Sequence, residues 1–572
     1  MIEKAIENWL INTNETNYRT PFFQLILNKY ELVKNTHGPL EDGKDIVAKD
    51  SDGNYIAFQL KSGNINTTEW RKIKSQIDEL IELDIRHPSF ESRRPDETYL
   101  VINGSVDSFA NEKIKSYNKS KVDRGFNKLK IIDKDELLQM FKEAQGKFTP
   151  DEYDDFYLFL DILTSDGSDL LPKEKIIEFL NKIIFNKKFT RESNRINAIS
   201  SSLIIVSYLL DPFQNKNNYF AIFEAWTCLC ALILNFSYKS KIKSEKWKES
   251  IYLILSEIER NLILLKNETL MKKKFFEGSI AGETRTVYDS RALMVLGTLS
   301  VLEIFLSCSD EDYHRDEDLI ELIKENKDNL YFWGESAFPY VFSIIKYLER
   351  EGERDIAISL LEEIFNILIE RNQPRKQFGL PDPYCDVKKV LEGLLRLDFD
   401  LKRYEYIISD ILAIDSSKEF KEIYPEIMRV RRIRPGRTEQ IMDEILHNSH
   451  LLKIDFKDFN GSSFILESLI LMLTRRDKKD LLTKKWREIS HIRMETFDFD
   501  NKEDIFSWRT RDGKFHDELP KSPQKWDDLV TKSKIIDTDE MHLENSLFML
   551  FLILVFPHRA NTTIINFLDD HF

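Results

Sequence analysis

Cysteine, glycine and proline are all scarce in this sequence of 572 residues, which holds 4 Cys, 18 Gly and 16 Pro. Four cysteines make no disulfide framework, and their spacing is not that of a zinc site. Cys228 and Cys230 lie inside an apolar run, so we expect them to be buried and chemically inert. A chain of this kind is suited to a reducing compartment, and the cytoplasm is its expected location.

Long apolar runs free of charge are also missing. Leu547–Phe556 is too short to cross a bilayer, and Tyr219–Phe236 carries Glu224 near its start. We expect both to be buried helices and expect no membrane partner. The N-terminal MIEKAIENWL has the pattern of an amphipathic helix rather than of a secretory signal. A phosphate-binding GxxxxGK[ST] loop is absent, which argues against an NTPase motor in this chain.

Net positive charge is the third absence. The 83 Lys and Arg are outnumbered by 98 Asp and Glu, giving a formal charge of −15. This balance argues against a protein that coats nucleic acid by bulk attraction, but it allows a local basic site. Residues 1–145 are nearly neutral, with 22 basic and 24 acidic side chains, so most of the acidity lies further along. Hydrophobic content of 42% over this length predicts a globular protein of two to four domains.

Residues 1–145 are expected to form a mixed α/β domain. Helical periodicity covers Ile2–Ile11 and Pro21–Tyr30. Asn66 and Glu69 have the spacing of a capping box at the start of a third helix. Strand-like runs occupy Glu31–Asn35, Asp45–Lys49, Tyr55–Lys61, Thr98–Gly104 and Lys128–Ile132.

Residues 146–572 are expected to be all-α, with room for two subdomains. The polar stretch Gly146–Asp155 is the predicted boundary, and beyond it helical periodicity dominates. One example is the apolar pattern of Val341–Leu348, a turn at Gly352, and a second pattern at Ile356–Leu368. Such hairpins stack into solenoids, but no fixed period is found. A degenerate repeat array and an irregular helical domain both stay open.

The run Tyr55–Lys61 carries an unusual polar pair. Alternation along a strand places Gln59 and Lys61 on one face, opposite the apolar face of Ile56, Phe58 and Leu60. A buried ammonium is costly unless it is paired, so a negative group is expected nearby. Asp45 opens the preceding strand and can converge with this pair across a hairpin. Hard oxygens beside an ammonium suit Mg²⁺-assisted cleavage of phosphodiesters.

At these residues, Asp45…Gln59-Leu60-Lys61, the sequence resembles the PD-(D/E)xK nucleases, in the Gln-containing variant of Mrr-like restriction endonucleases. The resemblance includes the flanks GKDIVAKDSDGNYIAFQLKSG and TYLVING and covers only residues 1–145. It implies a restriction-endonuclease-like fold with Asp45, Gln59 and Lys61 as catalytic residues. It also implies Mg²⁺, with Mn²⁺ as a substitute, held by Asp45, the Gln59 side chain and the Leu60 carbonyl.

One ligand of that family has no obvious counterpart. The family usually supplies a glutamate from the first helix, and the nearest position in PFFQLIL is the neutral Gln24. Glu7 or Glu41 is our predicted substitute. We expect Asp45 and Lys61 to lie at an exposed strand end, so that their removal creates no core cavity.

Two basic segments lie in the later part of the chain. RVRRIRPGR holds Arg429, Arg431, Arg432, Arg434 and Arg437, whose guanidinium groups could bind DNA phosphates. A charged loop that pairs with neighbouring acids is the alternative. Trp508–His516 is expected to be an exposed loop.

The predicted function is therefore a Mg²⁺-dependent DNA endonuclease with a helical sensing or regulatory region. Restriction or antiphage defence is expected by analogy, with DNA and a partner defence protein or a second copy of the chain as partners. The alternatives are a non-catalytic helical interaction protein with a degenerate nuclease fold, and an RNA-cleaving toxin.

Overall fold

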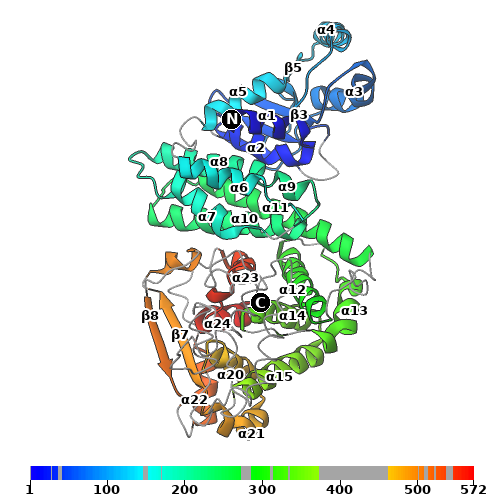
Figure 1. Ribbon diagram of the computed structural model, residues 1–572. Coiled ribbons are helices and arrows are strands. Elements are labelled where there is room, and N and C mark those ends of the chain that lie inside the picture. The colour runs from blue at the N-terminus through cyan, green and yellow to red at the C-terminus, as the bar shows by residue number, and fades with distance from the viewer. Residues whose placement is uncertain are drawn as a thin grey trace. The chain divides into compact units, whose positions relative to one another are not determined.

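The protein is described by a computed structural model. The described residues are 2–27, 29–36, 42–145, 153–168, 171–271, 285–309, 313–330, 332, 335–372, 462–499, 501–507, 513–520, 524–535 and 545–572. The chain forms two compact units, Met1–Glu257 and Ile258–Phe572, each described by itself below (Figure 1). Glu41 and Arg429–Arg437 lie outside the described residues.

A five-stranded sheet is the centre of the N-terminal region, as expected from the sequence. The strand order is β1-β2-β3-β4-β5; β1, β2 and β3 pair antiparallel, whereas β3, β4 and β5 pair parallel. The strands are β1 Leu32–Asn35, β2 Ile46–Lys49, β3 Tyr55–Lys61, β4 Glu97–Ile102 and β5 Leu129–Ile132. The helices are α1 Ile2–Asn12, α2 Glu15–Leu27, α3 Thr67–Glu82, α4 Ser108–Asp123 and α5 Lys134–Gln145.

β3 is the middle strand, and both of its faces are covered. Phe58 packs edge-on against Phe22 of α2, with ring centroids 5.5 Å apart. Ala57 on the opposite face joins a core cluster with Trp70 and Ile77 of α3. The predicted cap is present, because the Asn66 side chain accepts hydrogen bonds from the second and third residues of α3. The polar face expected for β3 is thus confined to the carboxyl end of the strand.

Helices complete the first unit. They are α6 Tyr153–Leu163, α7 Lys173–Leu180, the π-helix η1 Asn181–Phe185, α8 Glu192–Leu209, α9 Asp211–Gln214, α10 Tyr219–Lys239 and the part of α11 (Lys246–Met271) up to Glu257. α2 packs on α8, and its Thr20 and Gln24 side chains hydrogen-bond to Glu257 and Ser250 of α11. The predicted boundary near residue 145 therefore falls inside a compact unit.

The described part of the second unit is mostly helical but includes three strands. They are β6 Ser462–Ser463, β7 Arg493–Phe499 and β8 Gly513–Glu518, in the order β6-β7-β8. The all-α prediction for residues 146–572 is wrong here, because Arg493–Phe499 forms a strand that pairs antiparallel with β8. His516, expected in an exposed loop, belongs to β8.

The predicted helical hairpin is confirmed, with α14 Phe338–Arg350, a turn at Gly352 and α15 Arg354–Arg371. The other helices that the structure describes in this unit are α12 Arg285–Ser309, α13 Glu317–Asn326, α20 Leu466–Arg475, α21 Lys479–Ile489, α22 Trp526–Ser533, α23 Ser546–Val555 and α24 Thr562–His571. Short 3₁₀ turns occupy Lys327–Asn329, Glu335–Ala337, Lys502–Phe506 and Pro557–Arg559.

Within the described parts of the chain, two helical stretches are long and apolar enough to cross a membrane by length and composition alone. They are Tyr219–Lys239 and Ala292–Ser309, and 89% and 72% of the respective apolar windows are buried inside the protein. Cys228 and Cys230 are buried in the first of them, as expected. Burial of this extent is typical of core helices.

Candidate active site

Asp45 and Gln59 lie opposite each other across the β2–β3 hairpin. The register pairs Ile46 with Phe58, which places the preceding Asp45 beside Gln59. Gln59 Nε2 donates a hydrogen bond to Asp45 Oδ2 at 2.6 Å. The Leu60 N–H donates to the same oxygen, also at 2.6 Å. The convergence expected from the sequence is therefore present, but Asp45 is only 3% exposed, so the expectation that it lies at an exposed strand end is wrong.

α2 adds an acid and a base that sequence reasoning did not assign to the site. Glu15, in its first turn, lies 3.1 Å from Lys61 Nζ. Arg19, one turn further on, places a guanidinium nitrogen 2.8 Å from Asp45 Oδ1 and 4.0 Å from Glu15. Two carboxylates thus alternate with two cations in a partly buried cluster of zero net charge. Burial raises the pKa of Glu15, and the charge of Lys61 partly opposes that rise.

Tyr18 holds α2 against the end of β3. Its hydroxyl lies 2.8 Å from the Lys61 carbonyl and accepts a hydrogen bond from the Lys61 N–H at 3.1 Å. The same hydroxyl lies 3.1 Å from the Val101 carbonyl on β4. Burial raises the pKa of Tyr18 well above its usual value, so the hydroxyl stays protonated. The Tyr18 contact therefore fixes the start of α2, which carries Glu15 and Arg19, beside Lys61.

The loop before β2, residues 42–44, packs against α3 and positions Asp45. Gly43 has φ +71°, and a Cβ there would lie 2.3 Å from the Gln76 carbonyl oxygen, so only glycine allows the loop to approach α3. Lys44 is buried and donates to the carbonyls of Asp42 and Glu79 at 3.0 and 3.2 Å. Burial lowers the pKa of Lys44 to about 8. The loop is therefore held by backbone contacts before Asp45 enters the sheet.

The acids predicted to complete the site lie elsewhere or are not described. Glu7 is on α1 and pairs with Lys134 at 3.6 Å. Gln24 accepts a hydrogen bond from Ser250 at 3.2 Å. No described contact joins either of them to Asp45, and Glu41 lies outside the described residues. Glu15 was missed because the predicted helix began at Pro21, a common first helical position, whereas α2 begins six residues earlier.

The residues present fit Mg²⁺ in chemistry. Glu15 and Asp45 supply carboxylate oxygens, and Gln59 and Leu60 add amide and carbonyl oxygens, all hard ligands of the kind that Mg²⁺ uses together with water. Among the described residues no group of three or more His, Cys, Asp or Glu is placed to hold a metal. In the present arrangement Arg19, Gln59 and Leu60 donate to Asp45. Metal binding would require Arg19 to release Asp45 and the Gln59 amide to turn its oxygen inward.

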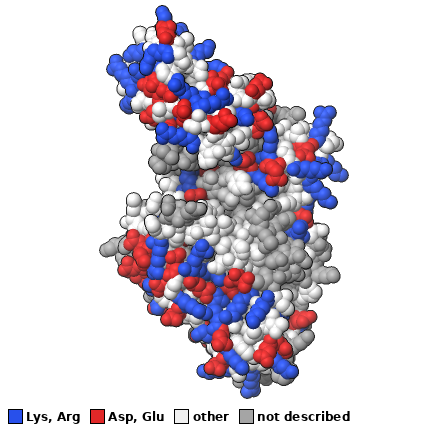
Figure 2. Space-filling model, turned by 180° about the vertical axis from the view of Figure 1, so that it is seen from behind, with Lys and Arg blue, Asp and Glu red and all other residues white. Residues whose placement is uncertain are grey.

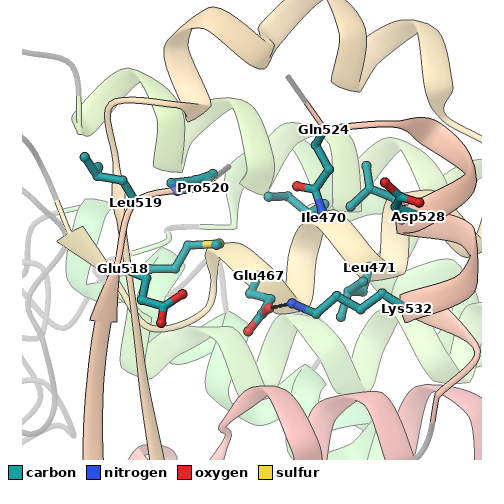
Figure 3. Close-up of a pocket in the computed structure, with 11 residues that line it drawn as sticks. Glu467, Ile470, Leu471, Glu518, Leu519, Pro520, Gln524, Asp528 and Lys532 are labelled. Carbon is teal, nitrogen blue, oxygen red and sulfur yellow. Dashed lines mark hydrogen bonds and ion pairs between the residues drawn. The ribbon is translucent and has the colours of Figure 1, made fainter. Parts of the chain in front are cut away.

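The second unit contains a pocket of about 380 Å³ (Figure 3). Its apolar floor includes Ile470 and Leu471 of α20, and Glu467 forms an ion pair with Lys532 at its edge. Glu518 and Asp528 add two more carboxylates. None of the residues predicted to act in catalysis lines this pocket.

Comparison with known proteins does not assign the chain to a family. No family model, no curated protein and no solved structure matches it.

Proposed function

We propose that the protein is a Mg²⁺-dependent DNA endonuclease whose active site lies at the carboxyl end of β3. The observation that carries this proposal is the meeting of Asp45, Gln59, Lys61 and Glu15 at one point of the sheet. The order of strands and the Asp45…Gln59-x-Lys61 spacing also fit the restriction-endonuclease-like fold. A role in restriction or antiphage defence is part of the same proposal.

The roles follow from the contacts. Asp45 and Glu15, with oxygens of Gln59 and Leu60, would hold Mg²⁺. A bound Mg²⁺ supplies a polarised water and neutralises charge on the phosphate. Lys61, positioned through Tyr18 and Glu15, would orient the attacking water and stabilise negative charge in the transition state. Arg19, once released from Asp45, would bind a phosphate oxygen, because guanidinium groups suit such contacts.

A second candidate is a degenerate nuclease fold that binds nucleic acid without cleaving it. The hydrogen bonds that Arg19, Gln59 and Leu60 donate to Asp45 favour it, because they satisfy the principal metal ligand without a metal. The two candidates differ in metal binding and in turnover.

Cleavage of supercoiled plasmid, linear duplex and total RNA, each with and without Mg²⁺, tests the proposal. We expect Mg²⁺-dependent nicking that Asp45→Asn and Lys61→Ala each reduce by roughly 100-fold or more. Asp45→Asn is preferred to alanine because its side chain can still accept the Leu60 N–H, whose loss would cost about 1–3 kcal/mol.

Lys119→Ala, an exposed lysine of α4 in the same unit, is the matched control and should cleave normally. Retained nicking in the Lys61 or Asp45 variant would refute the assignment of the site. Cleavage of RNA alone would favour the toxin alternative, and DNA binding without turnover would favour the degenerate fold.

A further inference from the structure

Two loops of the first unit bring together basic residues that are separated in the sequence. Residues 186–191 follow η1, and residues 239–246 join α10 to α11. We call them the basic loop pair. Their exposed or half-exposed cations are Lys187, Lys188, Arg191, Lys239, Lys241, Lys243 and Lys246.

Arg195 and aromatic packing hold the two loops side by side. Its guanidinium donates to the Phe189 carbonyl at 3.1 Å and to the Ser240 carbonyl at 2.9 Å. Phe185 and Phe189 pack on Phe236, with ring centroids 5.4 and 6.1 Å away. The Ser244 N–H donates to Glu192 at 2.8 Å, which closes the junction. These contacts hold the two loops in a fixed arrangement.

The cations of the loop pair are mostly unpaired. Elsewhere in the unit, Lys34, Lys61 and Lys121 form ion pairs with acids, whereas among the described residues exposed cations such as Arg71 and Lys119 do not. Within the described parts of the chain, six cations of the loop pair form no ion pair: Lys187, Lys188, Arg191, Lys241, Lys243 and Lys246. The nearby acids are already engaged, since Glu245 pairs with Lys248 and Glu249 with Lys34. Uncompensated positive charge on a chain of net charge −15 points to an anionic partner.

The distribution of charge on the surface agrees with a basic patch on this part of the unit (Figure 2). In Figure 2 Lys and Arg side chains gather at the right-hand edge of the view, on the helical part of the first unit. Over the region of the sheet, by contrast, acidic and basic side chains are interspersed.

The distance between the basic loop pair and the candidate site suits a polyanion that contacts both of them. α11 starts at Lys246 and reaches Glu257, whose carboxylate accepts a hydrogen bond from Thr20, next to Arg19, at 2.6 Å. Lys246 and Glu257 are separated by about 16 Å at the rise of an α-helix. That distance corresponds to about five base pairs of duplex.

We infer that the basic loop pair binds the phosphate backbone of DNA and holds the substrate for the candidate site. This inference rests on the proposed function for its choice of DNA, but binding can be measured without cleavage. The unpaired lysines, the fixed junction and the short span to α2 support a backbone contact that carries no base readout.

The test is the salt dependence of binding of the full chain to a 30-base-pair duplex, measured by fluorescence anisotropy in EDTA. The variants are a first triple, Lys187→Gln, Lys188→Gln and Arg191→Gln, and a second, Lys241→Gln, Lys243→Gln and Lys246→Gln. Each should weaken binding at least tenfold near 0.1 M salt and lower the slope of log K against log salt by about 2–3. A control triple in the second unit, Lys484→Gln, Lys525→Gln and Lys534→Gln, makes the same charge change and should leave both values unchanged.

Wild-type affinity in both loop-pair variants would overturn the inference, even if the protein cleaves DNA. Reduced DNA binding in a protein that never cleaves would support the inference and contradict the proposed function. Two further probes are measured in parallel. One is a vesicle of phosphatidylcholine with 30% phosphatidylserine, and the other is a single-stranded RNA. Stronger loop-pair-dependent binding to either of them than to the duplex would overturn DNA as the partner.

Discussion

Arg19 sets the charge of the candidate site in the metal-free protein. Its guanidinium lies 2.8 Å from Asp45 and 4.0 Å from Glu15, so a divalent cation that uses these carboxylates must displace it. A charge-assisted hydrogen bond of this kind is worth about 1.5–3 kcal/mol. The side chain therefore competes with the metal.

Replacing Arg19 should strengthen metal binding while it weakens cleavage. For Arg19→Met we expect Mn²⁺ affinity to rise roughly tenfold, because the bond to Asp45 no longer has to be broken and the cluster gains a net negative charge. Cleavage should fall, because the phosphate contact is lost. Titration calorimetry with MnCl₂ measures the first effect, with Arg71→Met, an exposed arginine of α3, as the control. Unchanged or weaker Mn²⁺ binding would contradict competition.

Gln59 offers a second test at the residue scale. Gln59→Glu replaces the hydrogen bond to Asp45 with two facing carboxylates. We expect a lower melting temperature in EDTA, a larger rise on adding Mg²⁺ than in wild type, and cleavage at lower Mg²⁺. Gln59→Ala should lose most of its cleavage. Thermal melts with and without Mg²⁺ measure this, and equal melting temperatures for Gln59→Glu and wild type in EDTA would contradict it.

At the scale of elements, the C-terminal helix α24 is fixed to its neighbours through one buried acid. Asp569 accepts hydrogen bonds from Arg475 and Arg476 of α20, at 2.6 and 2.7 Å. Its backbone carbonyl accepts from Lys346 of α14 at 2.7 Å. Burial alone would raise the pKa of Asp569, but the charge of Arg476 and the other cations outweighs it and holds that pKa well below its usual range.

Asp569→Asn should destabilise the protein by about 3–5 kcal/mol at neutral pH, because it leaves buried cations without their counter-charge. A lowered pKa means that this stabilisation is complete above the unfolded value near 4 and is lost as the pH falls below it. Urea unfolding at pH 7 and at pH 3.5 should therefore show a smaller difference between variant and wild type at the lower pH. Asp570→Asn, exposed on the same helix, is the control, and equal effects of the two substitutions would contradict the prediction.

At the scale of the whole molecule, the α/β region depends on helices that follow it in sequence. α2 is buried over most of its length, and its contacts include α8 and, through Thr20 and Gln24, α11. Lys34 of β1 pairs with Glu249 of α11 at 2.7 Å. A fragment that ends at residue 145 lacks all of these partners.

We expect residues 1–257, the first compact unit, to fold alone and bind Mn²⁺. Residues 1–145 should aggregate or stay unfolded, since the apolar face of α2 would be exposed to water. Circular dichroism, gel filtration and Mn²⁺ titration of the two fragments measure this. A monomeric, cooperatively melting 1–145 fragment would contradict the expectation and would favour the domain boundary predicted from the sequence.

Local patterns in the sequence were enough to predict the N-terminal strands, the cap at Asn66 and the α14–α15 hairpin, because periodicity and capping act over a few residues. The Asp45…Gln59-x-Lys61 part of the site was predictable for the same reason, since a hairpin of short loop fixes which residues face each other. β7 and β8 were missed because a short strand in a helical context has a weak local signal.

The sequence by itself thus determined the order of elements in residues 1–145 and the half of the candidate site on β2 and β3. Only the tertiary structure decided that Glu15 and Arg19 complete it and that Glu7 and Gln24 do not, because packing of α2 on the sheet joins residues 26 and 46 positions apart. The basic loop pair depends on the same kind of long-range packing, through Arg195 and Phe236. Contacts of this range are set by the packing of whole helices and have no short sequence pattern of their own.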